Sequence, residues 1–248
     1  MIVGIVALFT VLFFGGVQEY FFIEKLEKGV KKFVIEKDRS KEIMVDLKET
    51  KSMIKAFNKN RKGKLNEFLS MNLDRDIHRG SMDSFFDKRV DERLVFQQSM
   101  IEKRLLVTSK LEGSEWEEII KMSDASVEKK IVKLQKKGAK DPFESVEKTI
   151  QSAFSDQGKQ AQASAILQNF KTQYTKLLDE VNSINTLESK LLSNKGSTEK
   201  EFMSLANDMN QLRETAYQNF IDLHYDMKEI TDESEWTKVM KSVNKVIF

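Results

Sequence analysis

Two stretches of the chain, 120 residues apart, decide the fold. Residues 98–121 read QSMIEKRLLVTSKLEGSEWEEIIK, and residues 218–241 read QNFIDLHYDMKEITDESEWTKVMK. They align without a gap, and each contains the triplet Ser-Glu-Trp, which ends at Trp116 in the first and at Trp236 in the second. Apolar residues flank both triplets at matching positions, which makes chance similarity between two amphipathic helices an improbable explanation. The pattern indicates an internal duplication.

The same offset extends the match upstream and defines two repeats. Residues 26–28, LEK, fall on residues 146–148, VEK. We therefore expect one helical module over residues 23–137, which is basic, and a second over residues 143–248, which is acidic. Apolar residues recur every three or four positions in both, and no segment alternates convincingly as a strand does.

Each module is predicted to contain a short helix, two long antiparallel helices and a short helix that begins close to the tryptophan. Starts are indicated by capping residues and stops by glycines. The expected ranges are 23–36, 40–73, 81–111 and 114–136 in the first module, and 142–155, 159–194, 198–230 and 233–247 in the second.

The first residues of the chain predict a membrane anchor. The run from Ile2 to Val17 is uncharged and almost entirely apolar, and a helix over residues 2–22 would be about 30 Å long, which matches the hydrocarbon core of a bilayer. A cleaved signal peptide is the alternative, but no basic residue precedes the run and no small-x-small site ends it. The residues expected to contact lipid are Ile2, Ile5, Leu8, Phe9, Leu12, Phe13, Tyr20 and Phe21.

The expected fold class is therefore all-α, with an N-terminal transmembrane helix over residues 1–22 followed by two duplicated antiparallel helical-bundle modules. Basic residues follow the apolar segment and none precedes it, so the positive-inside rule places the body of a single-pass cell-membrane protein in the cytoplasm. A periplasmic body is the alternative. The plan resembles single-pass bacterial membrane proteins with helical bodies, at the level of architecture alone.

The charge of the chain is distributed unevenly. The formal net charge of +2 divides into +7 over residues 1–140 and −5 over residues 141–248. A solvated helix face is the ordinary interpretation of a basic run, and binding to anionic lipid is the alternative. Nucleic acid is not expected as a partner, because no aromatic residues alternate with the basic ones. The main basic patch consists of Lys48, Lys51, Lys55, Lys59, Arg61, Lys62 and Lys64.

The residue types that most enzymes use are scarce. The chain has no cysteine and only two histidines, which excludes thiol chemistry and cysteine-ligated metals. The motifs of phosphate loops, zinc helices, nucleophile elbows and di-iron bundles are absent. His224 lies two residues from Asp222 and from Asp226, a spacing that directs helical side chains away from one another. We therefore expect no catalytic residue, no metal site and no cofactor.

Trp116 and Trp236 are the residues most worth singling out. Large aromatic side chains dominate core packing, so the first interpretation is that each tryptophan fixes its short helix to a neighbouring hairpin. The other interpretation is a pair of equivalent anchor pockets for a partner.

These features together predict a non-enzymatic, membrane-anchored scaffold or adaptor that binds protein. Expected partners are membrane lipid, one or more unidentified proteins such as subunits of a membrane complex, and a second copy of the chain. The alternative function is a periplasm-facing helical sensor or chaperone-like binding protein.

Overall fold

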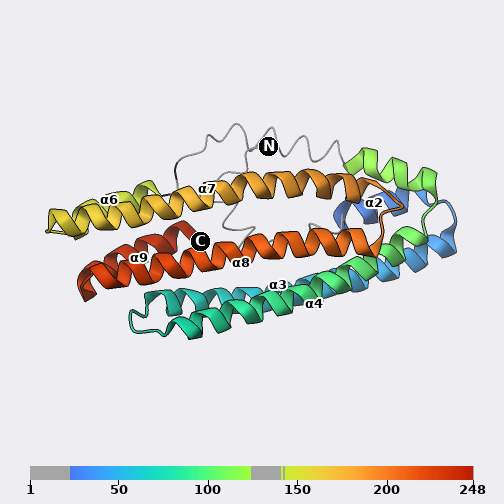
Figure 1. Cartoon of the computed structure of the whole chain (residues 1–248). Helices are drawn as coiled ribbons and strands as arrows, with labels where there is room; N and C mark the ends of the chain where they lie inside the picture. Colours follow the sequence, from blue (N-terminus) through green and yellow to red (C-terminus); the bar gives the residue numbers. More distant parts are fainter. Residues whose placement is uncertain (1–22, 124–140, 142, 248) are drawn as a thin grey trace.

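A computed structural model describes residues 23–123, 141 and 143–247, and all regular structure in this part of the chain is helical (Figure 1). The prediction of an all-α helical bundle is confirmed. The helices are α2 (Ile23–Phe33), α3 (Lys37–Leu73), α4 (Arg79–Ser109), an unlabelled helical segment over residues 113–123, α6 (Glu144–Ala153), α7 (Gln157–Ser193), α8 (Glu199–Ile230) and α9 (Glu233–Ile247).

The helices recur at the offset found in the sequence. Both ends of α7 lie 120 residues after the corresponding ends of α3, and α8 begins 120 residues after α4. The short breaks before α3 and α7 fall at residues 34–36 and 154–156, at the ends of the short helices expected over residues 23–36 and 142–155. Asp156 caps α7 by accepting a 2.8 Å hydrogen bond from the backbone N–H of Lys159, which explains why the helix begins there.

The two hairpins, α3–α4 and α7–α8, lie lengthwise against each other in opposite directions (Figure 1). The short helix that carries the tryptophan in each repeat reaches the tip of the other repeat's hairpin, while α2 and α6 pack beside the long helices of their own repeat. The indole Nε1–H of Trp236 donates to the Leu73 carbonyl at the end of α3, at 3.0 Å. The indole of Trp116 makes the equivalent bond to Ser193 at the end of α7, at 2.9 Å. The chain thus has an approximate internal two-fold arrangement.

The main hydrophobic core contains side chains from both repeats. Phe68 and Phe86 of the first repeat pack with Tyr217 and Phe220 of the second. The ring centroids of Phe68 and Phe220 are 5.2 Å apart, and Phe86 stacks on Tyr217 at 4.3 Å. Because each hairpin supplies one wall of this core, neither buries its apolar face alone.

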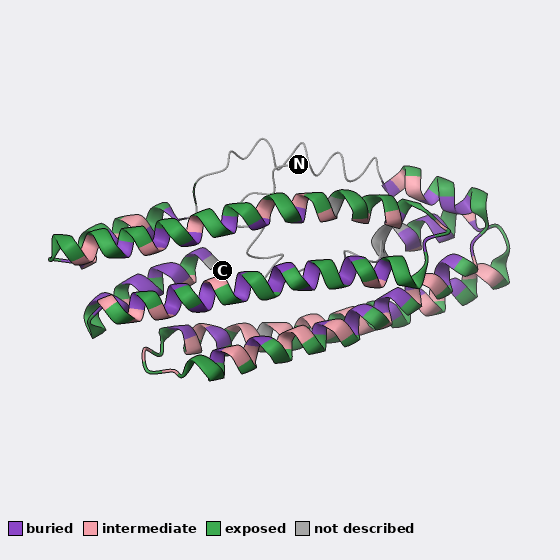
Figure 2. Cartoon of the chain, viewed as in Figure 1, coloured by how far each residue is buried: buried purple, intermediate pink, exposed green. Residues whose placement is uncertain are grey.

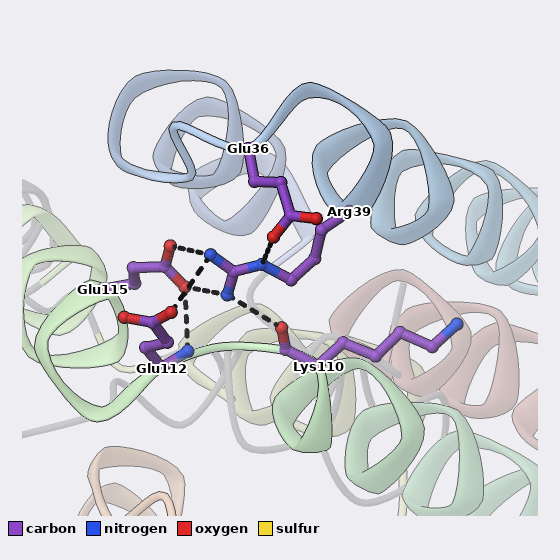
Figure 3. A network of polar contacts seen from close by, with 5 residues as sticks. All are labelled: Glu36, Arg39, Lys110, Glu112 and Glu115. Atoms are coloured by element: carbon purple, nitrogen blue, oxygen red, sulfur yellow. Dashed lines mark hydrogen bonds and ion pairs between the residues drawn. The ribbon is translucent and has the colours of Figure 1, made fainter.

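A charged contact at the same place in each repeat joins the start of the long helix to the short helix that ends the repeat. In the first, the guanidinium of Arg39 donates two 2.8 Å hydrogen bonds to the carboxylate of Glu115 (Figure 3). Glu115 also accepts a hydrogen bond from the backbone N–H of Glu112 and so caps the segment over residues 113–123. In the second repeat Lys159 and Glu235 form the corresponding pair, at 3.5 Å.

The predicted membrane anchor requires a correction. In residues 23–123 and 143–247, no helix combines the length and the apolar character that crossing a bilayer demands. This finding contradicts the transmembrane part of the fold class and the single-pass cell-membrane localisation, and we do not retain them. The lipid-contacting residues proposed from the sequence fall in residues 1–22, which lie outside the described part of the chain. The prediction of a transmembrane helix rested on the apolar composition of residues 1–22 alone.

Candidate functional site: a basic groove between α3 and α4

Two adjacent hollows follow the seam between α3 and α4, and we call them together the α3–α4 groove. The first is a cleft of about 490 Å³, counted to its open mouth, and the second is a wider depression of about 790 Å³. Lys64, Phe85 and Arg89 line both. The other lining residues are Phe57, Asn60, Arg61, Phe68, Phe86, Glu92, Arg93 and Tyr217 in the cleft, and Glu67, Met71, Gly80, Ser81, Ser84 and Lys88 in the depression.

Aromatic rings form the floor of the groove. Phe68 and Phe86 are buried, and their ring centroids lie 5.4 Å apart. Phe57 and Phe85 are half-buried, and Phe85 stacks on Phe68 at 5.9 Å. Because the buried rings belong to the main core, the floor is held in place by packing from beneath. The half-buried rings leave apolar surface for a ligand to cover.

Basic side chains dominate the walls. Five cations line the groove, Arg61 and Lys64 from α3 and Lys88, Arg89 and Arg93 from α4, against the carboxylates of Glu67 and Glu92. Lys64 pairs with Glu67 at 2.7 Å, and Arg89 pairs with Glu92. Each of these two pairs lies within one helix, so neither ties α3 to α4.

Some of these cations are partly removed from water. Burial lowers the pKa of the Arg61 guanidinium. The Nε of Arg89 is buried without a hydrogen-bond partner among the described residues, and the Arg89 guanidinium lies 5.6 Å from the Phe85 ring centre. A desolvated guanidinium interacts more strongly with an anion than a solvated one does.

Comparison of the two repeats shows which residues differ at the positions that line the groove. At the positions equivalent to Arg61, Lys64, Arg89 and Glu92, 120 residues later, the second repeat has apolar side chains, whereas Lys88 and Arg93 correspond to the charged residues Asp208 and Arg213. Val181, Met209 and Leu212 are buried in the main core, and Ile184 packs against it. Val181 corresponds to Arg61, Ile184 to Lys64, Met209 to Arg89 and Leu212 to Glu92.

The two hairpins differ accordingly. Helices α7 and α8 are held together by an apolar seam, whereas half-buried residues are frequent along α3 and α4 (Figure 2). Charged side chains do not interdigitate as aliphatic ones do, because each cation must keep contact with water or a counter-charge. The groove is therefore a consequence of the charged residues that the first repeat carries at Arg61, Lys64, Arg89 and Glu92.

The basic patch predicted from the sequence is divided by the fold. Arg61 and Lys64 line the groove, while Lys48, Lys51, Lys55 and Lys59 are exposed on the remainder of α3. The side chain of Lys62 lies outside the described part. Sequence reasoning missed Lys88, Arg89 and Arg93, although an alignment of the two repeats shows Arg89 opposite an apolar residue.

Both tryptophans are buried. Trp116 is 2% exposed and Trp236 is fully covered. Each indole N–H donates a hydrogen bond to a backbone carbonyl of the other repeat. Trp116 packs with Leu47 and Val107 of its own hairpin, and Trp236 lies against His224 of its own hairpin. Each tryptophan therefore packs on the hairpin of its own repeat and, through its indole N–H, also joins the tip of the opposite hairpin, which periodicity alone does not reveal.

The histidines take no part in the groove. His78 is exposed at the start of α4, and His224 is buried, with its Nδ1 3.1 Å from Oδ1 of Asn72. Burial lowers the pKa of His224 to about 4, so the ring is neutral at physiological pH. Within the described residues, no cluster of three His, Asp or Glu side chains is placed to hold a metal ion.

Comparisons of the chain with protein-family models, with curated proteins and with solved structures found no match.

Proposed function

We propose that the protein is a non-enzymatic helical adaptor that binds a protein partner through the α3–α4 groove. The observation that carries the proposal is the contrast between the repeats. One hairpin is closed by Val181, Ile184, Met209 and Leu212, and the other presents Arg61, Lys64, Arg89 and Glu92 at the same positions.

The composition of the groove supports a protein partner. Arginine and aromatic side chains are the residue types that contribute most to binding at protein interfaces, because they combine apolar area with directional hydrogen bonds. Arg61 and Arg89 lie beside Phe57 and Phe85 in the lining of the cleft, and Arg93 is buried behind them.

The shape of the groove supports the same choice. The cleft opens to solvent. The depression beside it is wide and open to solvent. Small-molecule sites are instead concave and cover most of the ligand.

A site-specific photo-crosslinking experiment tests the proposal. A photoreactive amino acid replaces Ser84, which lines the groove and is exposed. The matched control carries the same amino acid at Ser204, the exposed residue at the equivalent position of α8. We expect one protein adduct in cells, formed from position 84 and not from position 204. The same faint adducts from both positions would contradict the proposal.

A further inference from the structure

We infer that the ligand of the α3–α4 groove is an acidic amphipathic α-helix of the partner, about four turns long, laid along α3 and α4. This inference rests on the proposed function and specifies the chemistry that the groove recognises.

The length follows from the extent of the groove. On α3 it runs from Phe57 to Met71, and on α4 from Gly80 to Arg93. At the rise of an α-helix, each of these stretches is about 20 Å long. The two walls are therefore matched in length, as a third helix lying beside a hairpin requires.

The charge of the walls decides the polar face of the ligand. Cations from α3 and from α4 flank the aromatic floor on both sides. A helix with an apolar stripe on the floor and carboxylates on both flanks of that stripe would place acids beside Arg61 and Lys64 on one wall and Lys88 and Arg89 on the other. Guanidinium groups donate paired hydrogen bonds to carboxylates, so the two arginines would fix the register.

The positive charge of the groove argues against residues 124–140 of the same chain as its occupant. Residues 124–140 carry six lysines against Asp124 and Glu128. A segment of that composition is repelled by a groove in which five cations face two carboxylates.

The apolar stripe of the ligand has a counterpart within the fold. In the second repeat, aliphatic side chains fill the seam between the long helices. In the first repeat those positions are charged, and Phe57 and Phe85 remain half-buried beneath them. Leucine-type side chains from a partner helix would cover these rings, which is the favourable apolar contribution to binding.

Binding of a labelled peptide to the full chain tests the inference. The probe is an amphipathic peptide of about 18 residues with leucine on one face and glutamate on both flanks, a length at which helix formation is marginal but inducible. Its control has lysine at every glutamate. Fluorescence anisotropy is expected to show binding of the acidic peptide only, and weaker binding as salt is raised, since exposed ion pairs are screened.

Two double variants with the same change in net charge locate the site. In R61V/R89M the groove receives the residues of the second repeat, and we expect the acidic peptide to bind at least about tenfold more weakly. In K48A/K55A two exposed cations outside the groove are removed, and binding should change by less than about twofold. Circular dichroism confirms that both variants are folded, and R89K provides a milder change that keeps the charge but loses the paired geometry.

The outcomes separate this inference from the proposed function. Equal loss in both double variants would show attraction to basic surface in general and would overturn the inference. Failure of the acidic peptide to bind, with the Ser84 adduct still formed, would overturn the inference and leave the proposed function standing. Displacement of the peptide by a fatty acid that itself binds more tightly would assign the groove to a small anionic amphiphile instead. Absence of both peptide binding and adduct would overturn both.

Discussion

Arg104 and His224 occupy equivalent positions on α4 and α8, and each lies against the tryptophan of its own repeat. The guanidinium of Arg104 is 5.0 Å from the centre of the Trp116 ring, and the His224 and Trp236 rings are 4.7 Å apart in an edge-to-face arrangement. Burial lowers the pKa of Arg104 to about 10 and that of His224 to about 4. The two repeats therefore hold a cation and a neutral ring at the same place in the fold.

The stability of the protein should depend on pH through His224. Its pKa lies below the ordinary value of 6.5 in the folded chain, chiefly because the ring is buried and secondarily because Lys228 is near. Between pH 6.5 and about 4 the unfolded chain binds a proton that the folded chain does not. The free energy of unfolding should therefore fall as pH is lowered through this window, by up to about 3 kcal/mol in total.

His224→Gln isolates this contribution, since glutamine does not titrate. Urea unfolding at several pH values gives the difference in free energy of unfolding between the wild type and the variant. The carboxylates contribute equally to the pH dependence of both proteins, so their contributions cancel in this difference. The difference should shrink as pH falls from 6.5 to 4. A difference that stays constant over this range would show that His224 does not govern the dependence.

Replacing either tryptophan by phenylalanine should destabilise the protein by about 1–3 kcal/mol, because the indole N–H is lost and the smaller ring leaves space in the core. The bonds at Leu73 and Ser193 have nearly the same length, so Trp116→Phe and Trp236→Phe should have similar effects. The helical segment over residues 113–123 and the start of α9 lie toward opposite ends of the molecule (Figure 1), so the effects should add in the double variant. Unchanged denaturant midpoints with loss of partner binding would indicate a partner anchor instead.

Gly29 permits the close approach of α2 to the helical segment over residues 113–123. A Cβ at this position would overlap with Cγ1 of Ile119. Gly29→Ala should therefore destabilise the protein by about 1–3 kcal/mol through overpacking. Gly63→Ala is the matched control, because nothing lies within 4 Å of its Cβ position and alanine favours a helix by about 0.5–1 kcal/mol over glycine. Thermal unfolding should show shifts of opposite sign, and shifts of the same sign would contradict this explanation.

Placing the second repeat's residue in the first repeat, and the first repeat's residue in the second, should have opposite effects on stability. Arg89→Met replaces a partly desolvated cation with the apolar residue of the second repeat and should leave the free energy of unfolding unchanged or raise it by about 1 kcal/mol. Met209→Arg places a charge at a position that is 2% exposed and should lower it by about 3 kcal/mol or more. Guanidinium unfolding measures both. A large loss of stability in Arg89→Met would show that Arg89 has a structural role rather than a role in binding.

Part of the site could be read from the sequence and part could not. The run over residues 48–64 indicated basic residues on one helix, and Arg61 and Lys64 do line the groove. The sequence predicted that residues 81–111 lie beside residues 40–73, but it could not show that Lys88 and Arg89 share a groove with Arg61 and Lys64, because periodicity assigns a face to each residue without naming what that face meets. The prediction of a membrane anchor was wrong. It rested on the apolar composition of residues 1–22, and no helix in the described part of the chain crosses a bilayer.

Local chemistry determined the helices and their duplication. Capping residues such as Asp156 and Thr198 define where helices begin, and an unbroken offset relates the two repeats, because both are properties of short stretches of chain. Only the tertiary structure decided that each hairpin is capped by the opposite repeat, that Trp236 meets Leu73, and that one hairpin is open where the other is closed. Such contacts join residues more than a hundred positions apart, and their partners are selected by packing and desolvation in the assembled core rather than by neighbouring sequence.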